Sequence, residues 1–273
     1  MVNNAVQKQF EGFLQSNSLL LESSIVLPFE QFVFKKKRPL KNLDLVINDN
    51  LMLGKRVEYF FKHYLENYTE FSISKENIQI FKGTRTLGEL DYILQKNKQS
   101  YHIELAYKFY LYNPNQSTEE LENWIGPNKK DALLAKVDKL KHKQFPLLKT
   151  EEAIEALELP IETHKNILQQ QCVLGQLFIP KDYMNYVFKE IDPQAIVGYY
   201  ESYTVFLNTN HSDYYYYIPS KQNWLVPPEL HTNWLTYEAI NNELKENMAQ
   251  KKATLLWSKH IRGKTSSLFI TWW

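Results

Sequence analysis

The stretch LGELDYILQKNKQSYHIELAYKFY, residues 87–110, contains two apolar segments joined by the polar turn QKNKQ. Apolar residues recur in each segment with a period of two, which is typical of β-strands, so the stretch predicts a hairpin. Four charged residues, Glu89, Asp91, Glu104 and Lys108, interrupt the apolar pattern. Because side chains two positions apart share a face of a strand, Glu89 points with Asp91, and Glu104 points with Lys108.

These charges form either a site or an ordinary solvated face. If the two strands are neighbours, Asp91 and Glu104 converge, and two close carboxylates repel unless a cation lies between them. Such oxygen ligands suit Mg²⁺ or Mn²⁺, and a nearby lysine such as Lys108 could stabilise a phosphorane-like transition state. The residue types therefore fit metal-assisted hydrolysis of a phosphodiester. The alternative is the polar side of an antiparallel pair, with Lys108 as an ion-pair partner.

The segments around the hairpin predict an α/β (α+β) fold with a mixed sheet flanked by helices. Upstream, residues 54–64 have helical periodicity and residues 71–83 alternate as a strand. Downstream we expect helices over 133–140, 150–159, 160–171 and 236–252, and strands over 172–180 and in the last twenty residues. We expect an N-terminal arm (1–50) and a single elaborated domain (51–273). That domain comprises a core motif (54–112), a helical insertion (117–171) and a β-rich C-terminal part (172–273).

Bulk composition excludes several classes of protein. The net charge is +1, so overall electrostatics select no partner, although residues 32–41 and 126–143 are locally basic and could meet a polyanion. The single cysteine, Cys172, allows no internal disulfide and no multi-cysteine zinc site. The start of the chain lacks the pattern of a signal peptide, and its apolar runs are far shorter than a membrane span. We therefore expect a cytoplasmic protein without a membrane partner, and the sequence leaves the oligomeric state open.

A family resemblance adds to this interpretation. The string GELDYIL, a short connector and an apolar strand containing IEL with a nearby lysine resemble the PD-(D/E)XK nuclease superfamily. The segments WIGPNKKDALLAKVDKLKHKQFPL and WLVPP are similar to a bacterial family, domain of unknown function 1853, which its motifs place near these nucleases. The resemblance implies a restriction-endonuclease-like core, Mg²⁺ or Mn²⁺ as cofactor and nucleic acid as partner. It also implies that Asp91 and Glu104 bind the metal and that Glu58 is the acid of the upstream helix.

The lysine departs from the superfamily pattern. It ordinarily stands two residues after the second acid, roughly 7 Å along a strand, but Ala106 occupies that position here. Lys108 is the same-face candidate, roughly 13 Å from Glu104 along a straight strand. A bulge, a long lysine stem that reaches back, or lysine migration would recover the geometry. Loss of catalysis is the other outcome.

Several further residues are candidates with an ordinary alternative. Glu89 is either a third metal ligand or a structural partner. Glu58 can pair with Lys62 one helical turn away. Asn128, Lys129 and Lys130 precede the helix expected at 133–140. They could contact a substrate phosphate, or they could belong to a plain proline-initiated turn. Gln144, near the end of that helix, could contact a substrate strand or cap the helix. The seven histidines show no metal-binding spacing.

The leading hypothesis from sequence is a Mg²⁺-dependent nuclease with Asp91, Glu104, Lys108 and Glu58 at its centre, acting on DNA or RNA. Its rival is a binding or scaffold protein that keeps the nuclease fold without chemistry. A third possibility is an enzyme that acts on a nucleotide or another phosphorylated small molecule at the same site, without a basic DNA groove.

Overall fold

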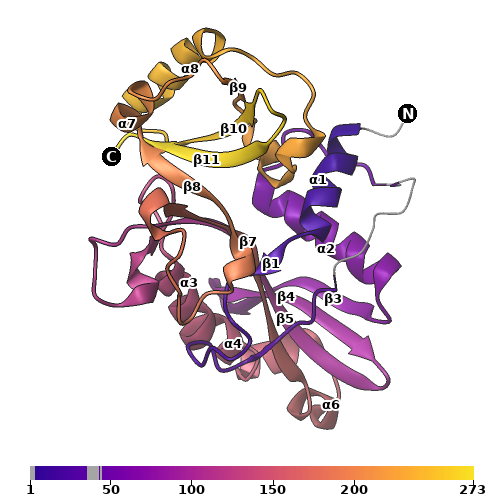
Figure 1. Cartoon of the computed structure of the whole chain (residues 1–273). Coiled ribbons are helices and arrows are strands. Elements are labelled where there is room, and N and C mark those ends of the chain that lie inside the picture. The colour runs from indigo at the N-terminus through magenta and orange to yellow at the C-terminus, as the bar shows by residue number, and fades with distance from the viewer. Residues whose placement is uncertain (1–3, 36–42, 44) are drawn as a thin grey trace.

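The computed structural model describes residues 4–35, 43 and 45–273 (Figure 1). Its described helices are α1 (Asn4–Leu14), α2 (Leu53–Tyr68), α3 (Leu133–Lys139), α4 (Phe145–Leu147), α5 (Glu151–Leu157), α6 (Ile161–Lys165), α7 (Tyr203–Leu207) and α8 (Tyr237–Ala249), with a π-helical turn η2 (Leu140–Gln144) after α3. The described strands are β1 (Asn17–Ser18), β2 (Glu30–Gln31), β3 (Ser72–Lys82), β4 (Arg85–Lys96), β5 (Gln99–Tyr112), β6 (Trp124–Ile125), β7 (Leu168–Pro180), β8 (Ile196–Ser202), β9 (Tyr214–Tyr217), β10 (Thr254–His260) and β11 (Thr265–Thr271).

All of these strands belong to one mixed sheet. Its order is β3-β4-β5-β7-β8-β11-β10-β9, with β1 and β2 added to β7 and β6 added to β5. The neighbours β5/β7, β7/β8 and β8/β11 are parallel, whereas β3/β4, β4/β5, β11/β10 and β10/β9 are antiparallel. Helices lie on both faces (Figure 1). The predicted α/β class with a mixed sheet flanked by helices is confirmed.

The predicted hairpin is formed by β4 and β5. Asn97 and Lys98 join the strands with positive φ angles of 51° and 66°, the left-handed conformation that two-residue hairpin turns require. The antiparallel ladder runs from Lys96↔Gln99 to Tyr92↔Ile103 and goes no further. Beyond this last pair the two strands continue but no longer form ladder pairs. Asp91 and Glu104 are the first residues of this unpaired part.

The parallel pair β5/β7 forms the middle of the sheet, and its ladder extends from Tyr101↔Leu168 to Leu111↔Phe178. Both strands are buried on both faces, as expected for central parallel strands. The odd-numbered β5 residues from Ile103 to Leu111 pack with α1 and α2, and the even-numbered residues face α3, η2 and α4. Because successive side chains of β5 point to opposite faces of the sheet, one face packs against α1 and α2 and the other against α3, η2 and α4.

The helix predicted over 160–171 is wrong in its second half. Helix α6 ends at Lys165, and Leu168–Pro180 is one continuous strand. The residues from Leu168 to Gln171 pair with Tyr101 to Glu104 of β5, so tertiary pairing overrides the weak local preference of the QQQ run. The other predicted elements are confirmed, including the start of α5, where the Thr150 hydroxyl accepts a hydrogen bond from the Ala153 N–H at 3.2 Å.

The N-terminal part, predicted as a covering arm, is built into the core. Phe10 and Phe13 of α1 pack against Phe60 of α2, with ring centroids 5.7 and 5.9 Å apart. Strands β1 and β2 both pair with β7. This part of the chain therefore completes one face of the sheet.

The close approach of β7 to β5 leads to a first prediction. A Cβ atom added at Gly175 would lie 2.0 Å from the main-chain oxygen of Lys108, so Gly175→Ala forces the two strands apart. We expect a loss of roughly 2–4 kcal/mol in the free energy of unfolding, measured by urea denaturation. Gly54→Ala in α2 is the control, because no atom lies within 4 Å of its added Cβ, and there we expect a gain of about 0.5–1 kcal/mol. Equal effects of the two substitutions would contradict the prediction.

Candidate active site

The candidate site begins where β4 and β5 stop pairing. Beyond the last pair, Tyr92↔Ile103, the main-chain N–H of Leu105 donates a hydrogen bond to Oδ2 of Asp91 at 2.8 Å. The Asp91 carboxylate thus accepts the hydrogen bond from the Leu105 N–H that a main-chain carbonyl of β4 would accept in a continued ladder. This contact holds the carboxyl group of Asp91 against β5, next to Glu104, as the convergence of the two strands predicts.

Glu104 is a fully buried acid whose carboxylate accepts hydrogen bonds from side chains. Its side chain is 0% exposed. Oε1 lies 2.9 Å from Nε2 of His102, and Oε2 accepts a hydrogen bond from the Gln144 side-chain amide. Burial of an ionised carboxylate is costly unless such donors compensate for its lost water.

The tautomer of His102 follows from its second neighbour. The Gln169 amide nitrogen donates to the main-chain oxygen of Phe145 at 2.8 Å and lies 3.1 Å from Nδ1 of His102. Nδ1 must therefore accept, which leaves the ring proton on Nε2, facing Glu104. Burial lowers the pKa of His102 to about 4, so the ring is neutral and donates to Glu104 without adding charge. Sequence reasoning missed His102, and its place two residues before Glu104 on one strand face was the available signal.

The two carboxyl groups hold a proton at neutral pH. Burial, reinforced by the charge of Glu104, raises the pKa of Asp91 to about 7. Burial also raises the pKa of Glu104 to about 8, against the opposing effect of the Lys136 charge. Two acids this close cannot both ionise easily without a nearby cation. The pair therefore has the electrostatic properties of a cation site.

The lysine beside the acid pair is Lys136, which was not among the predicted residues. Its Nζ donates to Oε1 of Gln144 at 2.9 Å. Burial lowers the pKa of Lys136, and the charges of Asp91 and Glu104 oppose part of that shift. Gln144 therefore bridges Lys136 to Glu104 through the two ends of one amide. A sequence signal existed: Lys136 lies three residues after Leu133 and four before Leu140, on the apolar stripe of its helix.

Lys108, the predicted lysine, points elsewhere. Its Nζ forms an ion pair with Oδ2 of Asp131 at 3.0 Å, and both side chains are more than a third exposed. The lysine beside the acid pair thus comes from another element, α3. Helix α3 and the π-helical turn that follows it, which together supply Lys136 and Gln144, pack across the Glu104 face of β5.

The remaining predicted acids flank the pair. Glu58 on α2 pairs with Lys55 at 2.7 Å rather than with Lys62, which pairs with Glu76. The charge of Glu58 raises the pKa of Asp91, so the predicted helix acid lies within electrostatic reach of the site. Glu89 is half-buried on β4, and its charge acts on Lys55.

The predicted phosphate-binding loop is tied to the C-terminus. Oδ1 of Asn128 accepts the main-chain N–H of Ala253 at 2.8 Å, and Nζ of Lys129 lies 4.1 Å above the ring of Trp273. Lys130 is exposed. These contacts anchor the loop, and a phosphate contact by Asn128, Lys129 or Lys130 stays a prediction. Of the four predicted substrate contacts, the structure places Gln144 at the acid pair.

The donor set fits a hard divalent cation held by few protein ligands. Within the described residues, no three His, Cys, Asp or Glu side chains form a metal-binding group. Mg²⁺ is commonly held by one or two carboxylates, with water and substrate phosphate as its other ligands. Asp91 and Glu104 provide two carboxylates at one point, and each carboxylate oxygen has two lone pairs, so hydrogen bonding leaves acceptor capacity.

Comparison with known proteins identifies the family. Residues 33–267 match the family model described as Domain of unknown function (DUF1853). The chain belongs to this family. The match covers β4, β5, α3 and η2, and hence all the residues of the acid pair and its surroundings. Searches of curated proteins and of solved structures returned no match. No helix in the described part of this DUF1853 protein is long and apolar enough to cross a membrane.

The acid pair leads to a prediction about stability and pH. Because folding raises the pKa of both carboxyls, the native state keeps protons that the unfolded chain has already lost, so the free energy of unfolding falls from about pH 4 to about pH 8. Asp91→Asn keeps an acceptor for the Leu105 N–H and removes the like charge. We expect it to be more stable than the parent at pH 8 by roughly 1–3 kcal/mol, with a smaller gain at pH 5, by chemical denaturation.

The matched control for this prediction is Asp138→Asn on α3, where the aspartate is exposed. It should change the free energy of unfolding by no more than about 0.5 kcal/mol at either pH. A parent protein whose stability rises between pH 5 and pH 8 would show that the two carboxyls are not held as described.

Proposed function

We propose that this DUF1853 protein is a metal-dependent phosphodiesterase of the PD-(D/E)XK type, acting on DNA or RNA, with Asp91, Glu104 and Lys136 at its centre. The observation that carries the proposal is the meeting of two proton-holding carboxyls, the fully buried Glu104 and the half-buried Asp91, with the half-buried Lys136. The lysine comes from α3 instead of the strand, so the residue types of the superfamily pattern are all present at one place.

Each residue has a definite task in this proposal. Asp91 and Glu104 would hold a Mg²⁺ or Mn²⁺ ion, and the chemistry that such an ion would supply is Lewis acidity toward the phosphate and activation of a water. Lys136 provides a positive charge for the developing negative charge on the phosphate oxygens. Gln144 and the neutral His102 position Glu104, and Gln144 also fixes the end of Lys136.

The surroundings supply charge for a polyanionic substrate. Residues 126–149 contain seven lysines and two aspartates. Lys139 lies close enough to Glu104 for its charge to lower the pKa of that acid, and its side chain is exposed. A basic surface beside the acid pair favours a nucleic acid over a neutral substrate, because phosphate contacts dominate such binding.

The first test of the proposal is metal binding. Mn²⁺ or Mg²⁺ must displace the proton held by Asp91 and Glu104, so millimolar metal should raise the melting temperature more at pH 8 than at pH 6, by a few degrees or more. Asp91→Ala should abolish this shift, and Asp138→Ala should retain it. Absence of any metal-dependent shift in the parent protein would favour the scaffold alternative, in which hydrogen bonds alone satisfy the acids.

The second test compares the two lysines. With Mn²⁺ and labelled single- or double-stranded DNA and RNA, Lys136→Met should lower the cleavage rate by about 100-fold or more, since it removes charge stabilisation at the reacting phosphate. Lys108→Met, which breaks only the surface pair with Asp131, should stay within about threefold of the parent. Equal activity of Lys136→Met and the parent would overturn the assignment of Lys136.

A further inference from the structure

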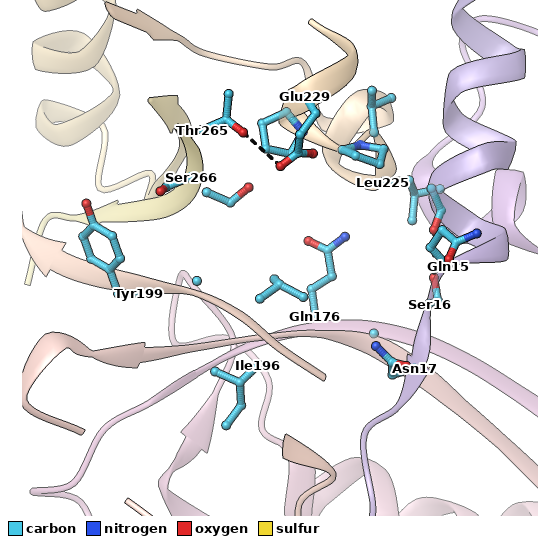
Figure 2. A pocket seen from close by; sticks show the side chains of 18 of the residues that line it. Gln15, Ser16, Asn17, Gln176, Ile196, Tyr199, Leu225, Glu229, Thr265 and Ser266 are labelled. Atoms are coloured by element: carbon cyan, nitrogen blue, oxygen red, sulfur yellow. Dashed lines mark hydrogen bonds between the residues drawn. The ribbon is translucent and has the colours of Figure 1, made fainter. Parts of the chain in front are cut away.

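A second site candidate lies on the opposite face of the sheet from the acid pair. A cavity of about 500 Å³ opens where β1 and the end of α1 meet β7, β8 and β11 (Figure 2). The short helical turns η5 (Lys221–Leu225) and η6 (Pro228–Leu230) close its far side. Tyr107 lines it from the odd-numbered face of β5, whereas Glu104 points to the other face. The cavity thus shares no lining residue with the acid pair.

The interior of the cavity combines uncharged polar side chains with apolar surface. Gln176 rises from β7 toward its middle, with Ser16 and Asn17 on one wall (Figure 2). The Asn17 amide nitrogen donates to the main-chain oxygen of Gln194 at 2.6 Å, which leaves its side-chain oxygen as the group oriented to accept. Ser267 adds a hydroxyl from β11. Amides and hydroxyls of this kind can each donate and accept, so they suit a ligand with both kinds of polar group.

The rim carries one charge of each sign. Glu229, at the start of η6, accepts a hydrogen bond from the Thr265 hydroxyl at 2.9 Å, and Thr265 occupies only one of the several acceptor positions of the carboxylate. Lys264, in the turn before β11, lies on the same rim and is exposed. Glu229 suits a hydrogen-bond donor of a ligand and Lys264 suits an anionic group, so the rim fits a ligand that carries both.

We propose that this cavity binds a nucleotide. A nucleobase with an exocyclic amine presents donors to the carboxylate of Glu229 and to the amide oxygen of Gln176, the pairing that carboxylate and amide side chains make with base edges. A hydroxyl of the sugar matches Ser267, and the phosphate matches Lys264. The volume lies within the roughly 300–1,000 Å³ of small-molecule sites. Pro227 and Pro228, which are half-buried, add apolar surface for the flat base.

The ligand chemistry has two sources, a free mononucleotide or an unpaired nucleotide within a strand. Either one would join three parts of the chain that are distant in sequence, namely residues 12–17, 175–199 and 225–267. Binding therefore stabilises the junction between the N-terminal elements and the C-terminal half. This inference does not rest on the proposed phosphodiesterase activity, because no residue of the acid pair takes part.

The test is binding of AMP, GMP, CMP and UMP to the full chain, followed by calorimetry and thermal shift in the absence of divalent metal. We expect at least one of the four to bind at micromolar to millimolar concentration and to raise the melting temperature. Gln176→Leu keeps the size of the side chain and removes its polar groups, so affinity should fall by about tenfold or more. Gln170→Leu, the same change on β7 outside the cavity, should leave affinity unchanged.

The controls separate this site from the acid pair and separate the two ligand sources. Glu229→Gln should weaken binding of nucleotides with an exocyclic amine more than binding of UMP, and Asp91→Asn should bind as the parent does. A short single-stranded oligonucleotide that competes with the mononucleotide identifies a strand as the source, and failure to compete identifies a free nucleotide. Absence of binding by all four nucleotides, or equal affinity of Gln176→Leu and the parent, would overturn the proposal.

Discussion

The parallel pairing of β5 with β7 is the constraint on which the rest of the structure depends. These strands run side by side in the middle of the sheet and are covered on both faces. Their contact is so close that Gly175 leaves no room for a side chain beneath the Lys108 carbonyl. With the two backbones fixed, alternation sends His102, Glu104 and Gln169 to one face and Tyr107 and Gln176 to the other.

The two faces differ in how they treat polar groups. On the face covered by α3, the buried Glu104 accepts hydrogen bonds from the neutral side chains of His102 and Gln144, and the half-buried Asp91 accepts one from the Leu105 N–H. Such an arrangement costs stability at neutral pH, because both carboxyls are pushed toward their protonated forms by burial. The pair of carboxyls adds no favourable free energy to folding at neutral pH. Ionisable groups with pKa values shifted in this way are concentrated at functional sites. On the opposite face, polar side chains such as Asn17 and Gln176 line a cavity instead of packing in the core.

Much of the fold was predictable because it is local. The alternating segments of residues 87–110, their two-residue turn and the helix that begins near Leu53 all follow from patterns within about fifteen residues. The failure at Leu168–Gln171 has the opposite cause: three glutamines carry no periodic signal, and their strand exists because β5 lies beside them. The π-helical turn at Leu140–Gln144 likewise has no signature in sequence, although it sets the position from which Gln144 reaches Glu104.

The sequence by itself determined the hairpin, the convergence of Asp91 and Glu104, and membership of the family, because side-chain alternation and segment similarity need no knowledge of distant contacts. The tertiary structure alone decided which lysine joins the acids. Lys108 is close in sequence but turns to Asp131, while Lys136 is more than thirty residues from Glu104 and arrives on a helix packed across the strand. The reason is physical: a straight strand cannot bring a residue four positions away back to the acid, whereas a helix crossing above it can.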